Sequence, residues 1–87
     1  MEFEFDPGKS RANERKHGIG FLGIQAIWED TQAVVVPARS TTEPRYAIIG
    51  KVEGRLWTCI FTVRGERIRI ISARRSRHEE QEGYANG

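Results

Sequence analysis

Arg67 and Arg69, separated by one residue, are the pair in this sequence best suited to bind an anion. They lie in the alternating run from Glu66 to Ser72, a pattern that predicts a β-strand. Residues two apart on a strand share one face, at a separation of about 7 Å. Because the planar guanidinium grips phosphate oxygens in pairs, this face could hold one phosphate group or two neighbouring ones. The alternative is an exposed strand that carries arginine only for solubility.

Basic residues concentrate in one part of the chain. Residues 45–78 contain nine Arg or Lys and two Glu, a net charge of +7. Residues 1–44 carry a net charge of −2 and residues 79–87 a net charge of −3, which gives +2 for the 87-residue chain. A basic segment of this kind attracts polyanions. A solvated, arginine-rich surface explains the same numbers equally well.

Three further arginines are candidate phosphate contacts. Arg64 lies in a predicted turn, where it could make a peripheral contact. Arg74 and Arg75 precede the last predicted helix, close to its positive end, where anions are favoured. For these two, binding and solvation are equally supported.

Candidate proton carriers and a base-stacking residue lie outside the basic segment. Lys16 and His17 end the first predicted helix, where basic side chains also simply complement the helix dipole. The ordinary pKa of histidine suits acid or base catalysis, and Lys16 could contact phosphate. Tyr84, in the last helix, could stack on an unpaired base or donate a proton, or it could anchor that helix to the core.

Several other chemistries lack their residues. The two histidines and the single cysteine are too scattered for a metal-ligand spacing, and no Gly-rich phosphate loop or Ser-His-Asp pattern occurs, so no metal or cofactor is expected. Cys59 has no partner for a disulfide, which fits a reducing cytoplasm. No apolar run approaches the roughly 20 residues of a membrane span, and no signal peptide is recognised, so a cytoplasmic location without membrane contact is expected.

The order of elements predicts an α+β domain. Asp6-Pro7 begins a polar helix that ends at Gly18, and Ser76 with Glu79 resembles the capping box of a last helix. Between them we predict a helix at 20–29 and strands at 33–36, 45–52, 56–63 and 66–72. The order is α-α-β-β-β-β-α, an antiparallel sheet packed against helices. Residues 1–87 form one domain, with 85–87 as a frayed tail.

The turn between the last two strands sets which side chains face the core. A two-residue loop at Arg64-Gly65 places Phe61 opposite Ile68 and Cys59 opposite Ile70. One face is then apolar, and the other presents Arg67 and Arg69. A slip of one residue would exchange the two faces.

Three groups of residues, in this order, resemble the BrnT family of toxins. The N-terminal group follows the pattern D-x-x-K then N-x-x-K-H-G, and two groups in the strands follow it. They are Asp6-Pro7-Gly8-Lys9 with Asn13, Lys16-His17-Gly18 and Phe21; Arg45-Tyr46-Ala47-Ile48-Ile49-Gly50; and Phe61-Thr62-Val63-Arg64-Gly65 with Arg67 to Arg74. Glu80 and Tyr84 match the end of the pattern, so the resemblance covers residues 5–84.

The resemblance implies a RelE-like fold and a toxin of a type II toxin–antitoxin system. It implies an endoribonuclease that inhibits translation and is neutralised by a ribbon-helix-helix antitoxin, BrnA, through which promoter DNA would be contacted only indirectly. Metal-free cleavage by the 2′-hydroxyl needs a base, cations for the phosphate and an acid. The catalytic candidates are Arg67, Arg69, His17 and Tyr84, and the RNA-binding candidates are Lys16, Arg64, Arg74 and Arg75.

Two other functions use the same basic face. One is a non-catalytic nucleic-acid-binding module that acts as a corepressor with its partner. The other is an interaction domain for an acidic protein. No element resembles the recognition helix of a helix-turn-helix pair, which argues against direct reading of DNA sequence. The resemblance favours the ribonuclease.

Overall fold

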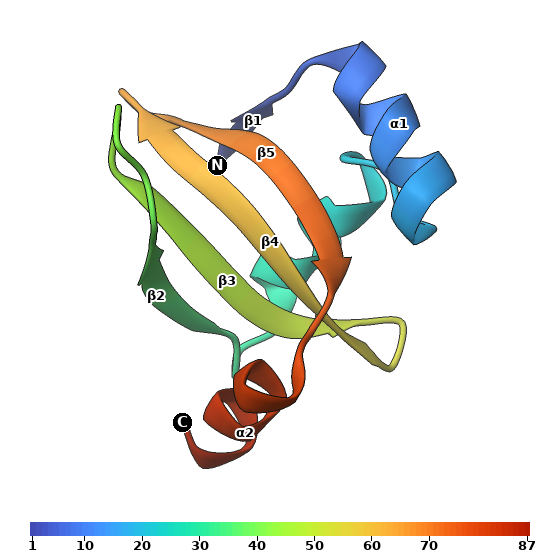
Figure 1. Cartoon of the computed structure of the whole chain (residues 1–87), viewed down its shortest axis with the longest axis vertical. Helices are drawn as coiled ribbons and strands as arrows, with labels where there is room; N and C mark the ends of the chain where they lie inside the picture. Colours follow the sequence, from blue (N-terminus) through green and yellow to red (C-terminus); the bar gives the residue numbers. More distant parts are fainter.

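The computed structural model describes residues 1–87 and has an α+β architecture (Figure 1). Five strands form one sheet in the order β1-β5-β4-β3-β2. In chain order the elements are β1 (Glu2–Glu4), α1 (Pro7–His17), the 3-10 helix η1 (Gly23–Glu29), β2 (Val34–Ala38), β3 (Arg45–Val52), β4 (Arg55–Arg64), β5 (Arg67–Arg75) and α2 (His78–Asn86).

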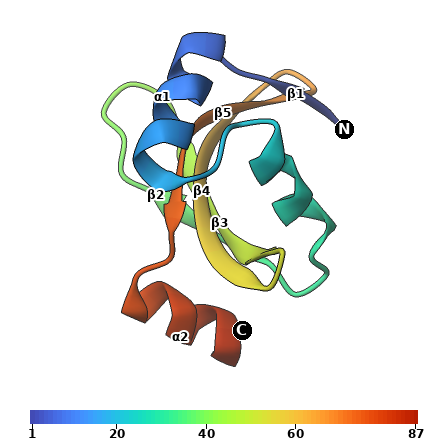
Figure 2. The same ribbon diagram turned by 90° about the vertical axis from the view of Figure 1, so that its right-hand side faces the viewer.

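The core lies between η1 and one face of the sheet, here called the inner face (Figure 2). Phe21, Ile24 and Ile27 are fully buried there, as the apolar spacing predicted. Gly50 in β3 allows this close approach, because a Cβ at this position would come within 2.9 Å of Ile27 Cγ1. The opposite, outer face is partly covered by α2 at one end, and it carries the arginines of interest.

The first strand is absent from the expected order. β1 pairs in parallel with β5, and Glu2, Phe3 and Glu4 lie beside Arg67, Ile68 and Arg69. The sheet is therefore mixed, and the expectation of a purely antiparallel sheet is wrong. Three residues are too few to show an alternating pattern, and the partner strand is about 65 residues away in sequence.

Two other elements differ from their sequence patterns. The helix expected at 20–29 is a 3-10 helix at Gly23–Glu29, which fits a short segment that begins with a poor helix former. The strand expected at 33–36 continues through Pro37 to Ala38 as β2. β2 is an edge strand, and there the missing N–H of proline disrupts no necessary ladder bond.

The β4–β5 turn also lies one residue later than predicted. Arg64 pairs with Arg67, so the loop is Gly65-Glu66, and the positive φ of Gly65 (61°) suits its first position. The partner of Phe61 is therefore Ile70 and not Ile68. Near the turn this register differs from the predicted one by two residues, so the faces are preserved and Arg69 lies opposite Thr62 on the outer face. Beyond a bulge between Ile60 and Phe61, Cys59 lies opposite Ala73 and not opposite Ile70 as predicted.

The cap of α2 is displaced by one residue as well. The N-cap is Arg77, whose N–H donates to Glu80 Oε1 at 2.7 Å, and the predicted pair Ser76 and Glu79 does not form the box. Ser76 is instead buried, with its Oγ 2.9 Å from Thr58 Oγ1. The displaced cap turns Glu80 towards the sheet, where it contacts Thr58 and Arg74.

Candidate active site

A pocket of about 170 Å³ opens between α1, the start of β3 with the segment before it, the end of β4 and the middle of β5. We call it the cationic pocket, because four basic side chains line it together with two carboxylates and two isoleucines. These residues are Lys9, Arg45, Arg64, Arg69, Asp6, Glu43, Ile70 and Ile71. A concave surface with this excess of positive charge is suited to bind a phosphate group.

Strand ends and a helix start place these cations. Arg45 is the first residue of β3 and Arg64 the last of β4, and antiparallel pairing brings these two ends together. Lys9 lies in the first turn of α1. That turn is fixed by Asp6, whose Oδ1 accepts the N–H groups of Lys9 and Gly8 at 3.2 and 2.8 Å. The same bonds, that of Lys9 first, lower the pKa of the Asp6 carboxyl.

Each arginine of the pocket has a nearby carboxylate. Arg69 Nη1 lies 3.2 Å from Glu4 Oε2, and both side chains are 29% exposed. Glu43 lies between the other two, 3.4 Å from Arg64 and 3.9 Å from Arg45. These distances exceed the roughly 2.7–2.9 Å of a strong charge-assisted hydrogen bond. The guanidinium groups at Arg64 and Arg45 are therefore loosely held.

Arg45 also carries a buried donor without a partner. Its Nε makes no hydrogen bond in the structure. An unpaired buried donor costs about 1–3 kcal/mol.

A second pocket, of about 270 Å³, continues from the first along α1 and β5. It shares Lys9 and Ile71 with the cationic pocket, and Lys16 and His17 line it farther along the helix. The two pockets together form what we call the basic groove. The groove thus brings two predicted site residues of α1 onto the same surface as Arg64 and Arg69.

Asn13 fastens α1 to the sheet beside this groove. Its amide Nδ2 donates to the carbonyls of Ile19 at 2.8 Å and Ala73 at 2.9 Å, and its Oδ1 accepts the Ala73 N–H at 3.2 Å. The side chain therefore takes the place of a neighbouring strand at the edge of β5. It is the one buried residue of α1.

Arg67 lies outside the cationic pocket. Its Nε is 3.6 Å from Glu2 Oε1, and its side chain is 59% exposed, twice the fraction for Arg69. It shares the outer face with Arg69 as predicted, but it does not line either pocket of the groove.

Arg74 is held by α2 at the other end of the outer face. Its two Nη atoms each donate to one oxygen of Glu80 at 2.8 Å. Thr58 and the Arg77 N–H also donate to Glu80. These bonds, that of Arg74 first, lower the pKa of Glu80 to about 2 although partial burial opposes the shift. In return, the hydrogen bond to Glu80 raises the pKa of Arg74.

Tyr84 lies in α2, in the half of the molecule away from β1 (Figure 1). Its hydroxyl donates to Asp30 Oδ2 at 2.7 Å, and this bond raises the pKa of the phenol. Asp30 also accepts the N–H groups of Lys51 and Gln32, which lower its own pKa. Tyr84 therefore ties α2 to the end of η1 and to β3.

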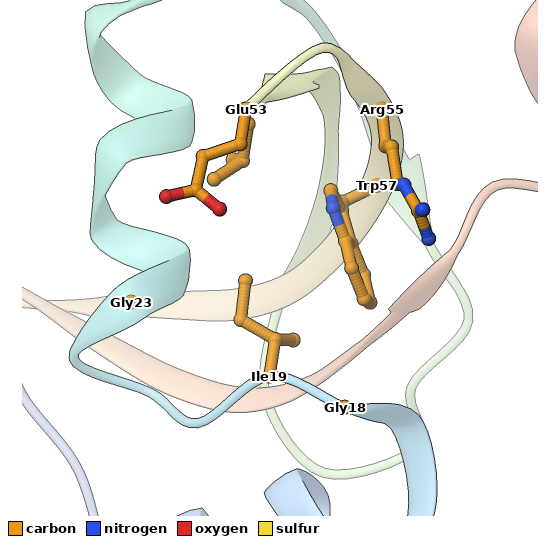
Figure 3. A pocket seen from close by; sticks show the side chains of 7 residues that line it. Gly18, Ile19, Gly23, Glu53, Arg55 and Trp57 are labelled. Atoms are coloured by element: carbon orange, nitrogen blue, oxygen red, sulfur yellow. The ribbon is translucent and has the colours of Figure 1, made fainter.

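Arg75 stacks on Trp57, with its guanidinium carbon 5.5 Å from the ring centroid. Trp57 lines a separate pocket of about 470 Å³ beside the β3–β4 turn, together with Ile19, Glu53 and Arg55 (Figure 3). Only 7% of Trp57 is exposed, so its ring belongs to the core. The structure does not bring Arg75 to the basic groove.

Sequence reasoning did not select Lys9, Arg45 or Glu43 as site residues. Lys9 and Arg45 are part of the quoted motifs, and that was the available signal. Glu43 belongs to a polar loop with no motif. Its position becomes visible only when the loop is placed beside β4.

No group of three or more His, Cys, Asp or Glu side chains is arranged to hold a metal ion. Cys59 is completely buried, which raises the pKa of its thiol. No helix is long and apolar enough to cross a membrane.

Fold and groove together define a small α+β domain with a phosphate-sized cationic pocket. Residues 5–80 match the family model described as the ribonuclease toxin BrnT of type II toxin–antitoxin systems. The chain therefore belongs to the BrnT family of ribonuclease toxins. Membership implies an RNA substrate and an antitoxin partner. A comparison with curated proteins found no match.

Proposed function

We propose that this toxin is a metal-independent endoribonuclease and that the basic groove is its active site. The observation that carries the proposal is the cationic pocket, where Arg45, Arg64 and Arg69 from three strands meet Lys9 of α1. A bound phosphodiester would place its non-bridging oxygens among these groups.

The proposed reaction is attack of the ribose 2′-hydroxyl on the adjacent phosphorus. Negative charge grows on the phosphate oxygens in the transition state, and preorganised arginines stabilise it more than they stabilise the substrate. Arg69 and Arg64 take this role, and Arg67 contributes from the rim. Lys16 binds a neighbouring phosphate along the groove. His17 lines the same second pocket, about 12 Å along α1 from Lys9, and we assign it to this neighbouring part of the RNA and not to the reacting oxygens.

The remaining predicted residues receive a different role in this proposal. Arg74 and Tyr84 are committed to Glu80 and Asp30, and Arg75 is stacked on Trp57. We assign them to holding α2 and the end of the sheet in place. They would act on RNA only through the shape of the domain.

In the cell, the proposed consequence is inhibited translation in the cytoplasm, relieved by a BrnA-like ribbon-helix-helix antitoxin. From the match to the toxin family we also propose that the fold is RelE-like. The antitoxin would cover the basic groove, because acidic groups complement its charge and speed the encounter. Hydrogen exchange of the complex tests this, since protection confined to α2 and β2 would contradict it.

The test of the function is cleavage of a defined RNA oligonucleotide by the purified chain in EDTA. We expect cleavage to persist and the upstream product to end in a 2′,3′-cyclic phosphate or a 3′-phosphate. An oligonucleotide with a 2′-deoxyribose at the cleaved position serves as the control and should remain intact. Binding without cleavage would favour the non-catalytic module, and activity restored only by a divalent ion would contradict the mechanism.

A further inference from the structure

Of the two acidic side chains that line the cationic pocket, only that of Glu43 lies between two arginines. It lies in the segment before β3, with its Oε1 3.4 Å from Arg64 Nη2 and its Oε2 3.9 Å from Arg45 Nη2. One of its carboxylate oxygens therefore faces each of two arginines on neighbouring strands. Apart from the two acidic side chains, the polar side chains that line this pocket are Lys and Arg, which carry no acceptor when charged. A carboxylate is therefore the type of group in this pocket that can receive a proton from a substrate.

The backbone around Glu43 is fastened to the sheet. The buried Thr62 Oγ1 donates to the carbonyl of Pro44 at 2.6 Å. On the other side, the Glu43 N–H lies 3.3 Å from Ser40 Oγ, which accepts it. These bonds hold the carboxylate over the ends of β3 and β4. A reacting group must be held in this way if proton transfer is to be efficient.

The second carboxylate of the pocket has another task. Asp6 accepts two backbone N–H groups at the start of α1, and these bonds lower its pKa. Protonation of Asp6 would remove the cap of the helix that carries Lys9. Glu43 makes no side-chain bond to the backbone, and its contacts with Arg45 and Arg64 are long. It can therefore accept a proton without disturbing an element of the fold.

We propose that Glu43 is the general base of the cleavage reaction, an inference that rests on the proposed function. Its carboxylate removes the proton of the 2′-hydroxyl, and the 2′-oxygen forms a bond to phosphorus. The bond from phosphorus to the 5′-oxygen breaks, and that oxygen takes a proton from a water molecule. The hydroxide left from this water removes the proton from Glu43, which restores the carboxylate. The products are a 2′,3′-cyclic phosphate and a 5′-hydroxyl.

The arrangement couples the movement of charge to the arginines. When Glu43 gains the proton, its attraction for Arg64 and Arg45 disappears. At the same moment the phosphate oxygens gain negative charge. The two guanidinium groups can then bind these oxygens without first breaking a tight ion pair.

The experiment compares Glu43→Gln and Glu43→Asp with the wild type, with Glu53→Gln as the matched control. Glu53→Gln makes the same change of charge. Glu53 lies in the turn after β3, at the opposite end of that strand from Glu43. Single- and multiple-turnover cleavage of the RNA oligonucleotide is measured from acidic to basic pH. Circular dichroism verifies that each variant is folded.

We expect Glu43→Gln to lower kcat about 100-fold or more, the usual contribution of a general base. KM should stay the same or fall, because the lost negative charge no longer repels RNA. The acidic limb of the kcat/KM profile should disappear. Glu43→Asp should keep that limb with reduced activity, and Glu53→Gln should match the wild type.

Two results would overturn the proposal. Glu43→Gln could cleave as fast as the wild type or faster, with the acidic limb intact, which would make Glu43 an anion that merely occupies the pocket. Glu43→Asp could cleave RNA but lack the acidic limb, which would show that the limb does not report a carboxylate at this position. If Arg69→Ala is inactive in either case, the proposed function stands without this base. If the wild type fails to cleave RNA, both proposals fall.

Discussion

Arg69 and Arg67 have the same place in the sequence pattern but different surroundings in the fold. Arg69 is half-buried beside Glu4 and lines the cationic pocket, whereas Arg67 is exposed beside Glu2 at the edge. A charge acts more strongly on a phosphate when water is partly excluded. The two residues should therefore contribute unequally to catalysis.

Replacing Arg69 by Ala should lower the cleavage rate about 30- to 1000-fold, because removal of one charge-stabilising donor costs about 2–4 kcal/mol of barrier. Arg69→Lys should restore only part of the rate, since an ammonium cannot hold two oxygens at once. Arg67→Ala should have a smaller effect. Single-turnover kinetics of the three folded variants measures this, and equal rates for Arg69→Ala and the wild type would remove Arg69 from the site.

Among the elements, α1 depends on one side chain for its attachment to the sheet. Asn13 satisfies both backbone groups of Ala73 at the edge of β5, a position that no strand occupies. The helix otherwise presents a polar surface and buries little else. The position of Lys9, Lys16 and His17 beside the groove therefore rests on this amide.

Asn13→Ala should lower the free energy of unfolding by about 1–3 kcal/mol, because buried backbone groups of Ala73 lose their partner. Asn13→Asp should cost more, since a carboxylate oxygen would replace the amide donor that faces two carbonyls. Urea unfolding measures both variants, with the exposed Asn86→Ala as the control. A change below about 0.5 kcal/mol in Asn13→Ala would show that the bond is not structural.

α2 is attached through an acid whose ionisation gives stability a defined pH dependence. The pKa of Glu80 is lowered to about 2, chiefly by Arg74, from an ordinary value of 4.5. A depressed pKa contributes stability above the ordinary value, and the contribution disappears as the pH falls towards 2. The folded protein should therefore weaken across this interval.

Glu80→Gln should be about 2 kcal/mol less stable than the wild type at pH 7, because charge-assisted bonds to Arg74 and the Arg77 N–H are weakened. The difference should shrink between pH 4.5 and pH 2, as the wild-type carboxyl becomes protonated. Urea midpoints of both proteins at pH 7 and pH 3 measure it. A constant difference at both pH values would contradict the assignment.

The elements show what local patterns can and cannot predict. The strands β3, β4 and β5 and the inward face of η1 followed from hydrophobic periodicity, because burial dominates their placement. β1 was not predicted because its pairing depends on a strand that is distant in sequence.

The cationic pocket was predicted only in part. Arg69 and Arg64 share a hairpin, whereas Lys9, Arg45 and Glu43 reach them through tertiary packing. Conversely, Arg74 is adjacent in sequence to the basic strand but is bound to Glu80.

At the scale of the molecule, the outer face is divided between structure and chemistry. The α2 end is closed by the Thr58–Glu80–Arg74 network, and the opposite end carries the cationic pocket. The net charge of only +2 therefore does not indicate where on its surface this chain can bind an anion. What matters is that acidic side chains are paired at one end, while loosely held arginines remain at the other.

The most direct test of the account compares two double variants with the same loss of charge. Arg45→Ala with Arg69→Ala removes two of the four cations of the cationic pocket, whereas Arg55→Ala with Arg77→Ala removes two arginines elsewhere on the surface. Both are assayed for single-turnover cleavage of one RNA oligonucleotide in EDTA, after unfolding curves establish that they are folded. The account predicts a loss of at least about 1000-fold for the pocket variant and near wild-type cleavage for the other. Equal losses in both variants, or cleavage by the pocket variant at the wild-type rate, would show that RNA is not cut in the basic groove.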